Sequence, residues 1–178
     1  MTVDVQARYL RALTQPSDIV DHLPTLHGAA ATAATVIELG VRRGVSSVAF
    51  LAGLPAGGRL HSVDVNRAPF VHPSWEFIQG DDLDPAVIAQ LPPACDVLFI
   101  DTSHTYSHTL DELATWAPTV RSGGVILLHD TELAHPDASP PSDPPFPVAR
   151  ALDDYCQSIG WAWTNTTGCY GLGRIDVP

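Results

Sequence analysis

The sequence predicts an α/β doubly wound domain whose mainly parallel sheet has seven strands and ends in an antiparallel C-terminal hairpin. Short apolar runs alternate with segments of helical spacing along most of the chain. The run at 95–101 is apolar almost throughout, which is typical of a strand covered on both faces. Residues 161–175 form two strand-like stretches around a Thr/Gly turn. These three observations favour one sheet with helices packed on it.

The first half of the chain is predicted to begin with two helical segments and to contain three strands. In order, elements are expected at 3–13 (helix), 17–34 (helix), 34–40 (strand), 45–54 (helix), 59–65 (strand) and 75–81 (strand). Pro24 is expected to break the second helix, because proline lacks an amide hydrogen and clashes within a helix. Gly40 closes the first strand, and the PAGG sequence at 55–58 stops the helix that follows it.

The second half continues this alternation and is interrupted by a proline-rich segment. In order, elements are expected at 84–91 (helix), 95–101 (strand), 105–120 (helix), 122–130 (strand) and 148–160 (helix), before the last two strands. Asp84 followed by Pro85 is a typical helix start. Residues 132–147 contain six prolines in sixteen positions, so neither a helix nor a central strand is expected there.

The composition is that of one folded domain without a nucleic-acid or membrane partner. With 178 residues, 45 % of them apolar, the chain is long enough for a single domain over 1–178. The formal net charge of −11 would repel phosphate backbones. No apolar run reaches the roughly 18 residues of a membrane span, and the first residues lack a signal-peptide layout. Three widely spaced cysteines fit reduced thiols, so a cytoplasmic protein is expected.

Polar residues or glycines follow five consecutive predicted strands at the point where each strand ends. They are Glu38-Leu39-Gly40, Asp64, Gly80-Asp81-Asp82, Asp101 and His129-Asp130-Thr131. Ligands of open parallel sheets bind beyond the carboxyl ends of the strands. The sequence therefore predicts a binding site at this edge of the sheet.

The turn after the first strand, ELGVRRGVSS, differs from a dinucleotide-binding turn. It has Gly40 and Gly44 but lacks the remaining glycine of GxGxxG. Glu38 precedes the first glycine, where its negative charge would disfavour a phosphate and suit a positively charged cofactor with an amino-acid head group. Asp64, about 20 residues further on, is placed to accept hydrogen bonds from ribose hydroxyls.

The sequences VIELGVRRGVSS, HSVDV and SGGVILLHD resemble those of class I S-adenosylmethionine-dependent methyltransferases. With FIDTSH included, the resemblance is closer to the small metal-dependent O-methyltransferases. These include catechol O-methyltransferase, the sugar and macrolide-sugar O-methyltransferases and the methyltransferase domain 24 type. The resemblance covers roughly residues 34–131 and implies a Rossmann-like methyltransferase domain with S-adenosyl-L-methionine as cofactor.

The resemblance implies a set of cofactor-binding residues, which are Glu38, Gly40, Val41, Gly44, Ser46, Asp64, Asp81 or Asp82, and Asp101. Gly40 and Val41 would approach the methionine part, which Glu38 and Ser46 would also contact. Asp64 would bind the ribose hydroxyls, and Asp81 or Asp82 the adenine amino group. The alternative for the two glycines is a plain tight turn, and the alternative for Ser46 is an ordinary first-turn residue. The aspartate that does not reach adenine would only favour the start of a helix.

The resemblance also implies a magnesium-like ion, with Asp101, Asp130 and Thr131 as ligands. Hard divalent cations prefer oxygen ligands and keep positions open for water or substrate oxygens. The third position is more usually Asn or Asp, so Thr131 would be a weak ligand that Glu132 or a water could replace. Alternatively, the two carboxylates only orient cofactor and substrate.

Three histidines lie near these carboxylates. His104 stands where the catechol-type enzymes have a catalytic lysine, and its ordinary pKa near 6.5 suits a general base; the alternative is a half-buried histidine hydrogen-bonded at a helix start. His108 lies one helical turn further on, but HxxxH without the glutamate of HExxH is a weak zinc signal, which favours a solvated residue. His129 is expected to point to the side of the strand end opposite to Asp130.

The predicted activity is methyl transfer to a hydroxyl group of a small molecule. The N-terminal helical cap at 1–33 is short for a catechol-type enzyme, which favours a sugar or glycosylated natural product. The segment 132–147 is expected to be a substrate-covering lid or a disordered excursion. The alternative functions are an NAD-dependent oxidoreductase and a non-catalytic cofactor-binding module. A homodimer is compatible with the sequence, although no apolar stripe demands one.

Overall fold

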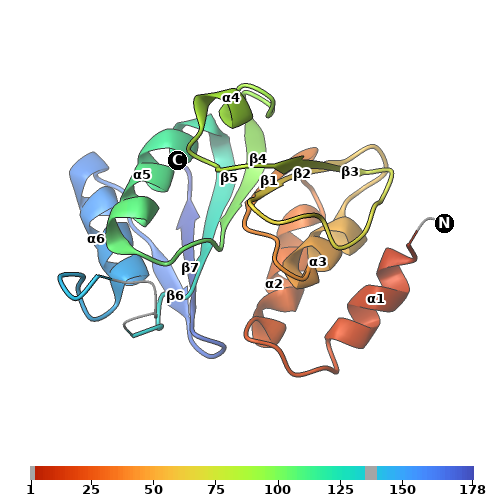
Figure 1. Ribbon diagram of the computed structural model, residues 1–178, viewed down its shortest axis with the longest axis horizontal. Coiled ribbons are helices and arrows are strands. Elements are labelled where there is room, and N and C mark those ends of the chain that lie inside the picture. Colours follow the sequence, from red (N-terminus) through yellow and green to blue (C-terminus); the bar gives the residue numbers. More distant parts are fainter. Residues whose placement is uncertain (1–2, 135–139) are drawn as a thin grey trace.

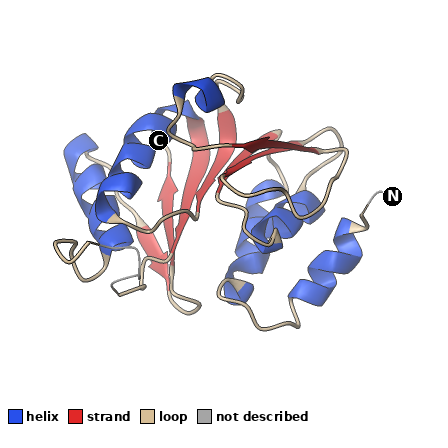
Figure 2. Ribbon diagram, viewed as in Figure 1, coloured by secondary structure: helices blue, strands red, loops and turns tan. Residues whose placement is uncertain are grey.

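A computed structural model describes residues 3–134 and 140–178 and contains a sheet of seven strands in the order β3-β2-β1-β4-β5-β7-β6 (Figures 1 and 2). The strands are β1 Thr35–Leu39, β2 Arg59–Asp64, β3 Trp75–Gln79, β4 Cys95–Ile100, β5 Val120–His129, β6 Thr164–Thr166 and β7 Leu172–Asp176. The first five are parallel, and β7 pairs antiparallel with both β5 and β6. The predicted fold class, including the antiparallel C-terminal hairpin, is confirmed.

Helices cover both faces of this sheet (Figure 1). The helices are α1 Val5–Ala12, α2 Leu23–Ala30 and α3 Val45–Gly53 on one face, and α4 Pro85–Ile88, α5 Tyr106–Trp116 and α6 Pro147–Ile159 on the other. Two short 3-10 turns, Val20–His22 and Ala117–Thr119, adjoin α2 and α5. No helix among residues 3–134 and 140–178 is long and apolar enough to cross a membrane.

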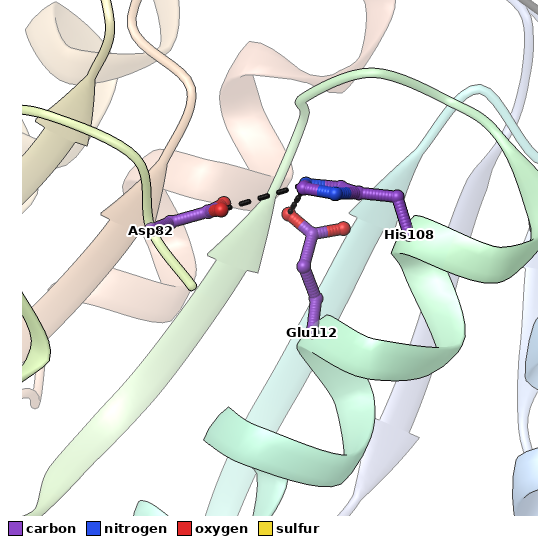
Figure 3. Close-up of side chains that lie close together, drawn as sticks. All are labelled: Asp82, His108 and Glu112. Atoms are coloured by element: carbon purple, nitrogen blue, oxygen red, sulfur yellow. Dashed lines mark ion pairs between the residues drawn. The ribbon is translucent and has the colours of Figure 1, made fainter. Parts of the chain in front are cut away.

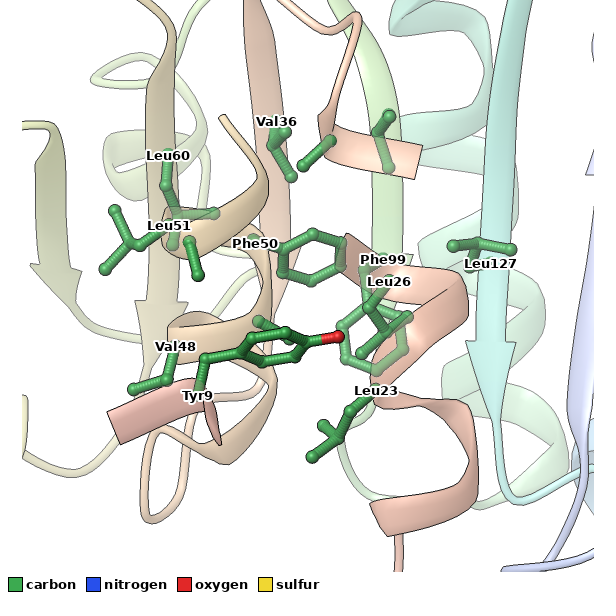
Figure 4. Close-up of a cluster of buried hydrophobic side chains, with 14 of the residues drawn as sticks. Tyr9, Leu23, Leu26, Val36, Val48, Phe50, Leu51, Leu60, Phe99 and Leu127 are labelled. Carbon is green, nitrogen blue, oxygen red and sulfur yellow. The ribbon is translucent and has the colours of Figure 1, made fainter. Parts of the chain in front are cut away.

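The alternation of side chains along β4 explains why this strand is apolar almost throughout. Phe99 packs on the side of α1, α2 and α3, where its ring meets Phe50 with centroids 5.4 Å apart (Figure 4). Leu98 and Ile100 point to the other face and join the core under α4, α5 and α6. Burial of each such side chain stabilises the fold by roughly 1.5–3 kcal/mol. Apolar contacts on both faces of the sheet therefore hold β4 in place.

Two details differ from the predicted elements. Pro24 does not break a helix but lies in the first turn of α2, where the amide hydrogen that proline lacks would have no partner within the helix. The helix predicted at 105–120 ends at Trp116, and β5 begins at Val120, two residues earlier than expected. Of the predicted lid at 132–147, residues 135–139 lie outside the described part of the chain.

The register of the central strands sets which residues meet at the carboxyl edge of the sheet. Phe99 pairs with Leu127, and Ile100 pairs with Leu128. The residues that follow, Asp101 and His129, therefore leave the sheet side by side. On the other side of β4, the Asp101 amide donates to the Leu39 carbonyl at 2.8 Å, which joins the end of β1 to the same edge.

Candidate functional site

A cavity of about 920 Å³ lies at the carboxyl edge of the sheet. Its lining includes the end of each of the first five strands, through Gly40, Asp64, Gly80, Asp101 and Asp130. This volume is within the range of small-molecule and cofactor sites. The structure therefore gathers the predicted strand-end residues around one space.

Gly40 is required where β1 approaches the end of β4. Its φ of +87° is unfavourable for other residues, and a Cβ atom at this position would lie 1.9 Å from the carbonyl oxygen of Asp101. Gly44 has a φ of +73° directly before α3, and a Cβ atom there would lie 2.9 Å from the side chains of Pro69 and Phe70. Both glycines thus serve close packing, and Gly40 also leaves its backbone open toward the cavity.

The Asp64 carboxylate fixes the turn after β1. Its Oδ2 accepts hydrogen bonds from the amides of Val41 and Arg42, both at 2.8 Å. Its Oδ1 accepts from the amide of Asn66 at 2.7 Å and from the Asn66 side chain at 3.2 Å. Burial alone would raise the pKa of Asp64, but these donors lower it below the ordinary value, so Asp64 is ionised at neutral pH.

Glu38 and Ser46 lie behind this turn rather than on the cavity. Glu38 is fully buried, and its two oxygens accept hydrogen bonds from Ser46 at 2.7 Å, Ser47 at 2.7 Å and Ser62 at 2.5 Å. Burial raises the pKa of Glu38 to about 7, although the hydroxyl groups oppose this rise. The carboxylate predicted to face a cofactor thus holds β1, α3 and β2 together.

The two aspartates that follow β3 have different surroundings. Asp81 is exposed and accepts a hydrogen bond from the Leu83 amide at 2.9 Å. Asp82 is buried and faces α5, where its Oδ1 lies 3.4 Å from Nε2 of His108. His108, predicted to be solvated, is instead half-buried between Asp82 and Glu112.

His104 bridges the carboxylates that end β4 and β5. Its Nε2 lies 3.1 Å from Asp101 Oδ1 and 2.9 Å from Asp130 Oδ2. His104 and Asp130 have positive φ values of 57° and 64°, a backbone strain that is frequent at functional sites. Burial alone would lower the pKa of His104, but hydrogen bonds and charge from the two carboxylates raise it to about 9.

His129 belongs to the same cluster, so the prediction that it points away from Asp130 is wrong. Its Nδ1 lies 3.1 Å from Asp130 Oδ2 and 3.4 Å from Asp101 Oδ1. Its Nε2 donates to the Cys169 carbonyl at 2.8 Å. The prediction assumed that side chains alternate through Asp130, but the positive φ of this residue ends the alternation and turns its carboxylate back toward His129.

Thr131, in contrast, is engaged elsewhere. Its hydroxyl donates to the Asn165 side chain in β6 at 2.6 Å. The structure thus brings Asp101 and Asp130 together without the Thr131 hydroxyl that was expected beside them. Glu132, the alternative third ligand, accepts from the Asn165 side-chain amide at 2.9 Å.

The donor set suits a divalent cation. Asp101, His104 and Asp130 each offer a ligand atom, and these atoms lie within 4.8 Å of one another. Nδ1 of His129 faces the same two carboxylates. Mg²⁺ is commonly bound through one or two carboxylates with water in its remaining positions, and imidazole is a further ligand for borderline metals. The fit therefore relies on the two carboxylates, because the Thr131 hydroxyl is engaged elsewhere.

Other cavity residues were missed by the sequence analysis, among them Asp18, Asn66 and Tyr170. Asn66 follows the end of β2 by two residues, so its position after a strand could have indicated it. Asp18 comes from the loop after α1 and pairs with Arg42 in the turn after β1. That contact joins segments far apart in the sequence, and no local pattern predicts it.

Comparison with known proteins gives a family match and several structural relatives. A family profile described as a methyltransferase domain matches residues 37–131. A crystal structure of a Corynebacterium glutamicum protein superposes with a TM-score of 0.73 at 19 % identity, covering 99 % of this chain and 91 % of that one. The O-methyltransferase TomG from Streptomyces achromogenes, in complex with S-adenosylmethionine, gives a TM-score of 0.65 at 19 % identity over 99 % and 91 %.

A third relative is about twice as long as this chain. The MycE methyltransferase of the mycinamycin biosynthetic pathway, in complex with Mg, S-adenosylhomocysteine and mycinamycin VI, has a TM-score of 0.68 at 18 % identity. The match covers 97 % of this chain and 53 % of that one. No curated protein sequence matches.

Proposed function

The chain belongs to the methyltransferase domain family, and on this premise we propose that it methylates a hydroxyl group of a small molecule with the help of a divalent cation. The predicted S-adenosylmethionine-dependent methyltransferase is confirmed by this membership. The proposal of an oxygen acceptor depends chiefly on one observation, the convergence of Asp101, His104 and Asp130 at the cavity. The family membership also argues against the oxidoreductase alternative.

The cofactor is proposed to lie along the ends of β1, β2 and β3. The turn at Gly40 leaves backbone accessible for the methionine part, and the carboxylate of Asp64 secures that turn by accepting from the Val41 amide. Asp64 already accepts four N–H groups, so the ribose hydroxyls would share its oxygens with the Asn66 side chain or displace it. Asp81, exposed at the cavity, is the better candidate for the adenine amino group because Asp82 faces α5.

Asp101 and Asp130 are proposed to hold the cation through their carboxylate oxygens, with water or substrate oxygens in the remaining positions. Such an ion, Mg²⁺ or another divalent cation, would lower the pKa of the substrate hydroxyl and fix its position. MycE, which was crystallised with Mg, supports this assignment. Glu38 and Ser46 are proposed to act indirectly, by supporting the turn from behind.

His104 is proposed to take the proton of the attacking hydroxyl. The substrate oxygen forms a bond to the methyl carbon, the bond from that carbon to sulfur breaks, and the hydroxyl proton goes to Nε2 of His104. A pKa of about 9 means that His104 carries a proton of its own at neutral pH in this arrangement. A cation held by Asp101 and Asp130 would lower this pKa, because the two carboxylates would then pair with the cation instead of with His104.

Replacement of His104 tests this role. Removing a general base typically costs about 10²–10⁴-fold in rate, so His104→Ala and His104→Gln are expected to lose at least about 100-fold in turnover while S-adenosylhomocysteine still binds. Wild-type turnover is expected to rise with pH as His104 loses its proton, and the variants lack this rise. The control is His72→Gln, which changes a histidine outside the cavity lining. Unchanged turnover in the His104 variants would remove His104 from the mechanism.

The acceptor is proposed to be a sugar or a glycosylated natural product, because the cavity is lined by carboxylates and other polar groups that suit a polyhydroxylated ligand. MycE, crystallised with mycinamycin VI, supports this class. A panel of sugars, glycosylated macrolides and catechols, assayed with the labelled methyl donor, tests the proposal. Methylation of catechols alone would contradict it.

A further inference from the structure

A second cluster of metal-ligating side chains lies beside the cavity, apart from Asp101 and Asp130. Asp82 follows β3, while His108 and Glu112 project from α5 toward it (Figure 3). We propose that Asp82, His108 and Glu112 bind a divalent transition-metal ion of the Zn²⁺ or Mn²⁺ type, distinct from the cation of the proposed methyl transfer.

The spacing of the three side chains suits a metal better than a hydrogen bond. His108 and Glu112 are four residues apart and therefore share one face of α5. Nε2 of His108 lies 3.4 Å from Asp82 Oδ1 and 3.5 Å from Glu112 Oε1, whereas hydrogen bonds from imidazole are normally about 2.7–3.2 Å long. Ligands about 2.0–2.1 Å from a tetrahedral ion lie about 3.4 Å from each other.

The second oxygens of both carboxylates are buried without a partner. With both acids ionised, Asp82 Oδ2 and Glu112 Oε2 accept no hydrogen bond from any described residue, whereas a protonated Glu112 would share its proton with Asp82. The Glu112 side chain is 0 % exposed and that of Asp82 is 7 % exposed. A buried polar group without a hydrogen bond costs about 1–3 kcal/mol, and more when it is charged. A cation bound by these carboxylates would offset that cost.

The surrounding contacts hold the ligands in place and leave a path to them. The Thr102 hydroxyl donates to Glu112 Oε1 at 2.7 Å, and the Trp116 indole donates to the Asp82 carbonyl at 3.1 Å. Such supporting hydrogen bonds orient metal ligands. Asp82 and His108 both line the cavity, so an ion could enter from it and keep open positions facing it.

The mixture of one imidazole and two carboxylates selects the class of ion. Mg²⁺ and Ca²⁺ prefer oxygen ligands alone, whereas Zn²⁺ and Mn²⁺ accept nitrogen and oxygen together. The competing explanation is an ion-pair cluster without metal, in which a protonated His108 pairs with the two acids and Glu112 shares a proton with Asp82. The two explanations differ in whether the protein binds a metal at this place.

The number of metal ions that variants of the full chain bind separates the metal site from the ion-pair cluster. Protein stripped with chelator is titrated with Mn²⁺ alone, and free Mn²⁺ is followed by electron paramagnetic resonance. Asp101→Asn/Asp130→Asn, which removes the first cation site, is expected to retain one bound Mn²⁺ per chain. Adding His108→Gln to this variant is expected to weaken that binding at least tenfold, whereas adding Asp111→Asn, an exposed neighbour on α5, leaves it unchanged.

The outcomes for the two proposed sites are distinguishable. If only the proposed methyl-transfer cation site is absent, the wild type and Asp101→Asn/Asp130→Asn each bind one Mn²⁺ per chain. Adding His108→Gln then abolishes Mn²⁺ binding in both proteins. If Asp101→Asn/Asp130→Asn binds none, or if His108→Gln and Glu112→Gln bind as tightly as their parent, the second site is refuted. Circular dichroism checks folding, and Zn²⁺ is expected to raise the Tm of Asp101→Asn/Asp130→Asn but not that of its His108→Gln derivative.

Discussion

Glu38 is a fully buried carboxylate whose partners are all neutral hydroxyl groups. Its pKa is about 7 in the folded chain against an ordinary value of 4.5, so the folded state binds more protons than the unfolded state between these values. Stability is therefore expected to fall as pH rises from about 4.5 to 7. Glu112, whose pKa burial also raises to about 7, acts in the same direction.

Glu38→Gln tests this consequence, because glutamine keeps the shape and remains neutral. Wild type is expected to lose up to about 3 kcal/mol of unfolding free energy from the titration of Glu38 between pH 5 and pH 8. The variant is expected to lose clearly less, with Glu112 and the three histidines of raised pKa, His104, His108 and His129, supplying the remaining dependence. Urea unfolding at both pH values measures this difference. An equal loss in both proteins would show that Glu38 is ionised in the fold throughout this range.

The sequence predicted which residues end the strands but not all of their partners. Asp64, Asp101 and Asp130 could be placed at the cavity because parallel strands present their carboxyl ends at one edge. The direction of His129 and Thr131 could not be predicted, since it depends on the left-handed backbone of Asp130. Similarly, Asp82 meets α5 through tertiary packing that leaves no local pattern.

At the scale of elements, the chain ends of β1 and β4 continue into a close backbone approach between Gly40 and Asp101. Gly40→Ala is expected to cost about 1–3 kcal/mol of stability or more, because the new methyl group would collide with the Asp101 carbonyl. It is also expected to weaken S-adenosylhomocysteine binding at least tenfold. Thermal unfolding and calorimetry measure the two effects.

Gly28→Ala is the matched control, since a Cβ atom at Gly28 in α2 would meet nothing within 4 Å. It is expected to be neutral or to stabilise the chain by about 0.5–1 kcal/mol. If Gly40→Ala behaved like Gly28→Ala, the close approach of β1 and β4 would not be what requires glycine.

The elements themselves were predictable because their signals are local. The strands alternate or are apolar throughout, and two of the helices, α1 and α4, start at capping aspartates. Pro24 was misjudged because the same residue that breaks a helix interior is favourable in a first turn. The early start of β5 follows from pairing of Val120 with Cys95, and such pairing is not readable from either segment alone.

At the scale of the whole molecule, the negative charge of the chain is partly gathered at one edge of the sheet. The aspartates that end β2, β4 and β5, with Asp81 and Asp82 after β3, line one cavity together with a single arginine, Arg42, among the described residues. Such a field attracts cations, which suits both a sulfonium cofactor and metal ions. In the proposed function, the cavity thus combines a turn at Gly40 for the cofactor with acidic groups where the acceptor would lie.

Binding of S-adenosylhomocysteine, measured by titration calorimetry, tests the central claim that this strand-end cavity holds the methyl-donor cofactor. The wild-type chain is expected to bind one molecule, Asp64→Ala to bind at least tenfold more weakly, and Asp111→Asn to bind like wild type. No binding by the wild type, or equal affinity after loss of the Asp64 carboxylate, would contradict the claim.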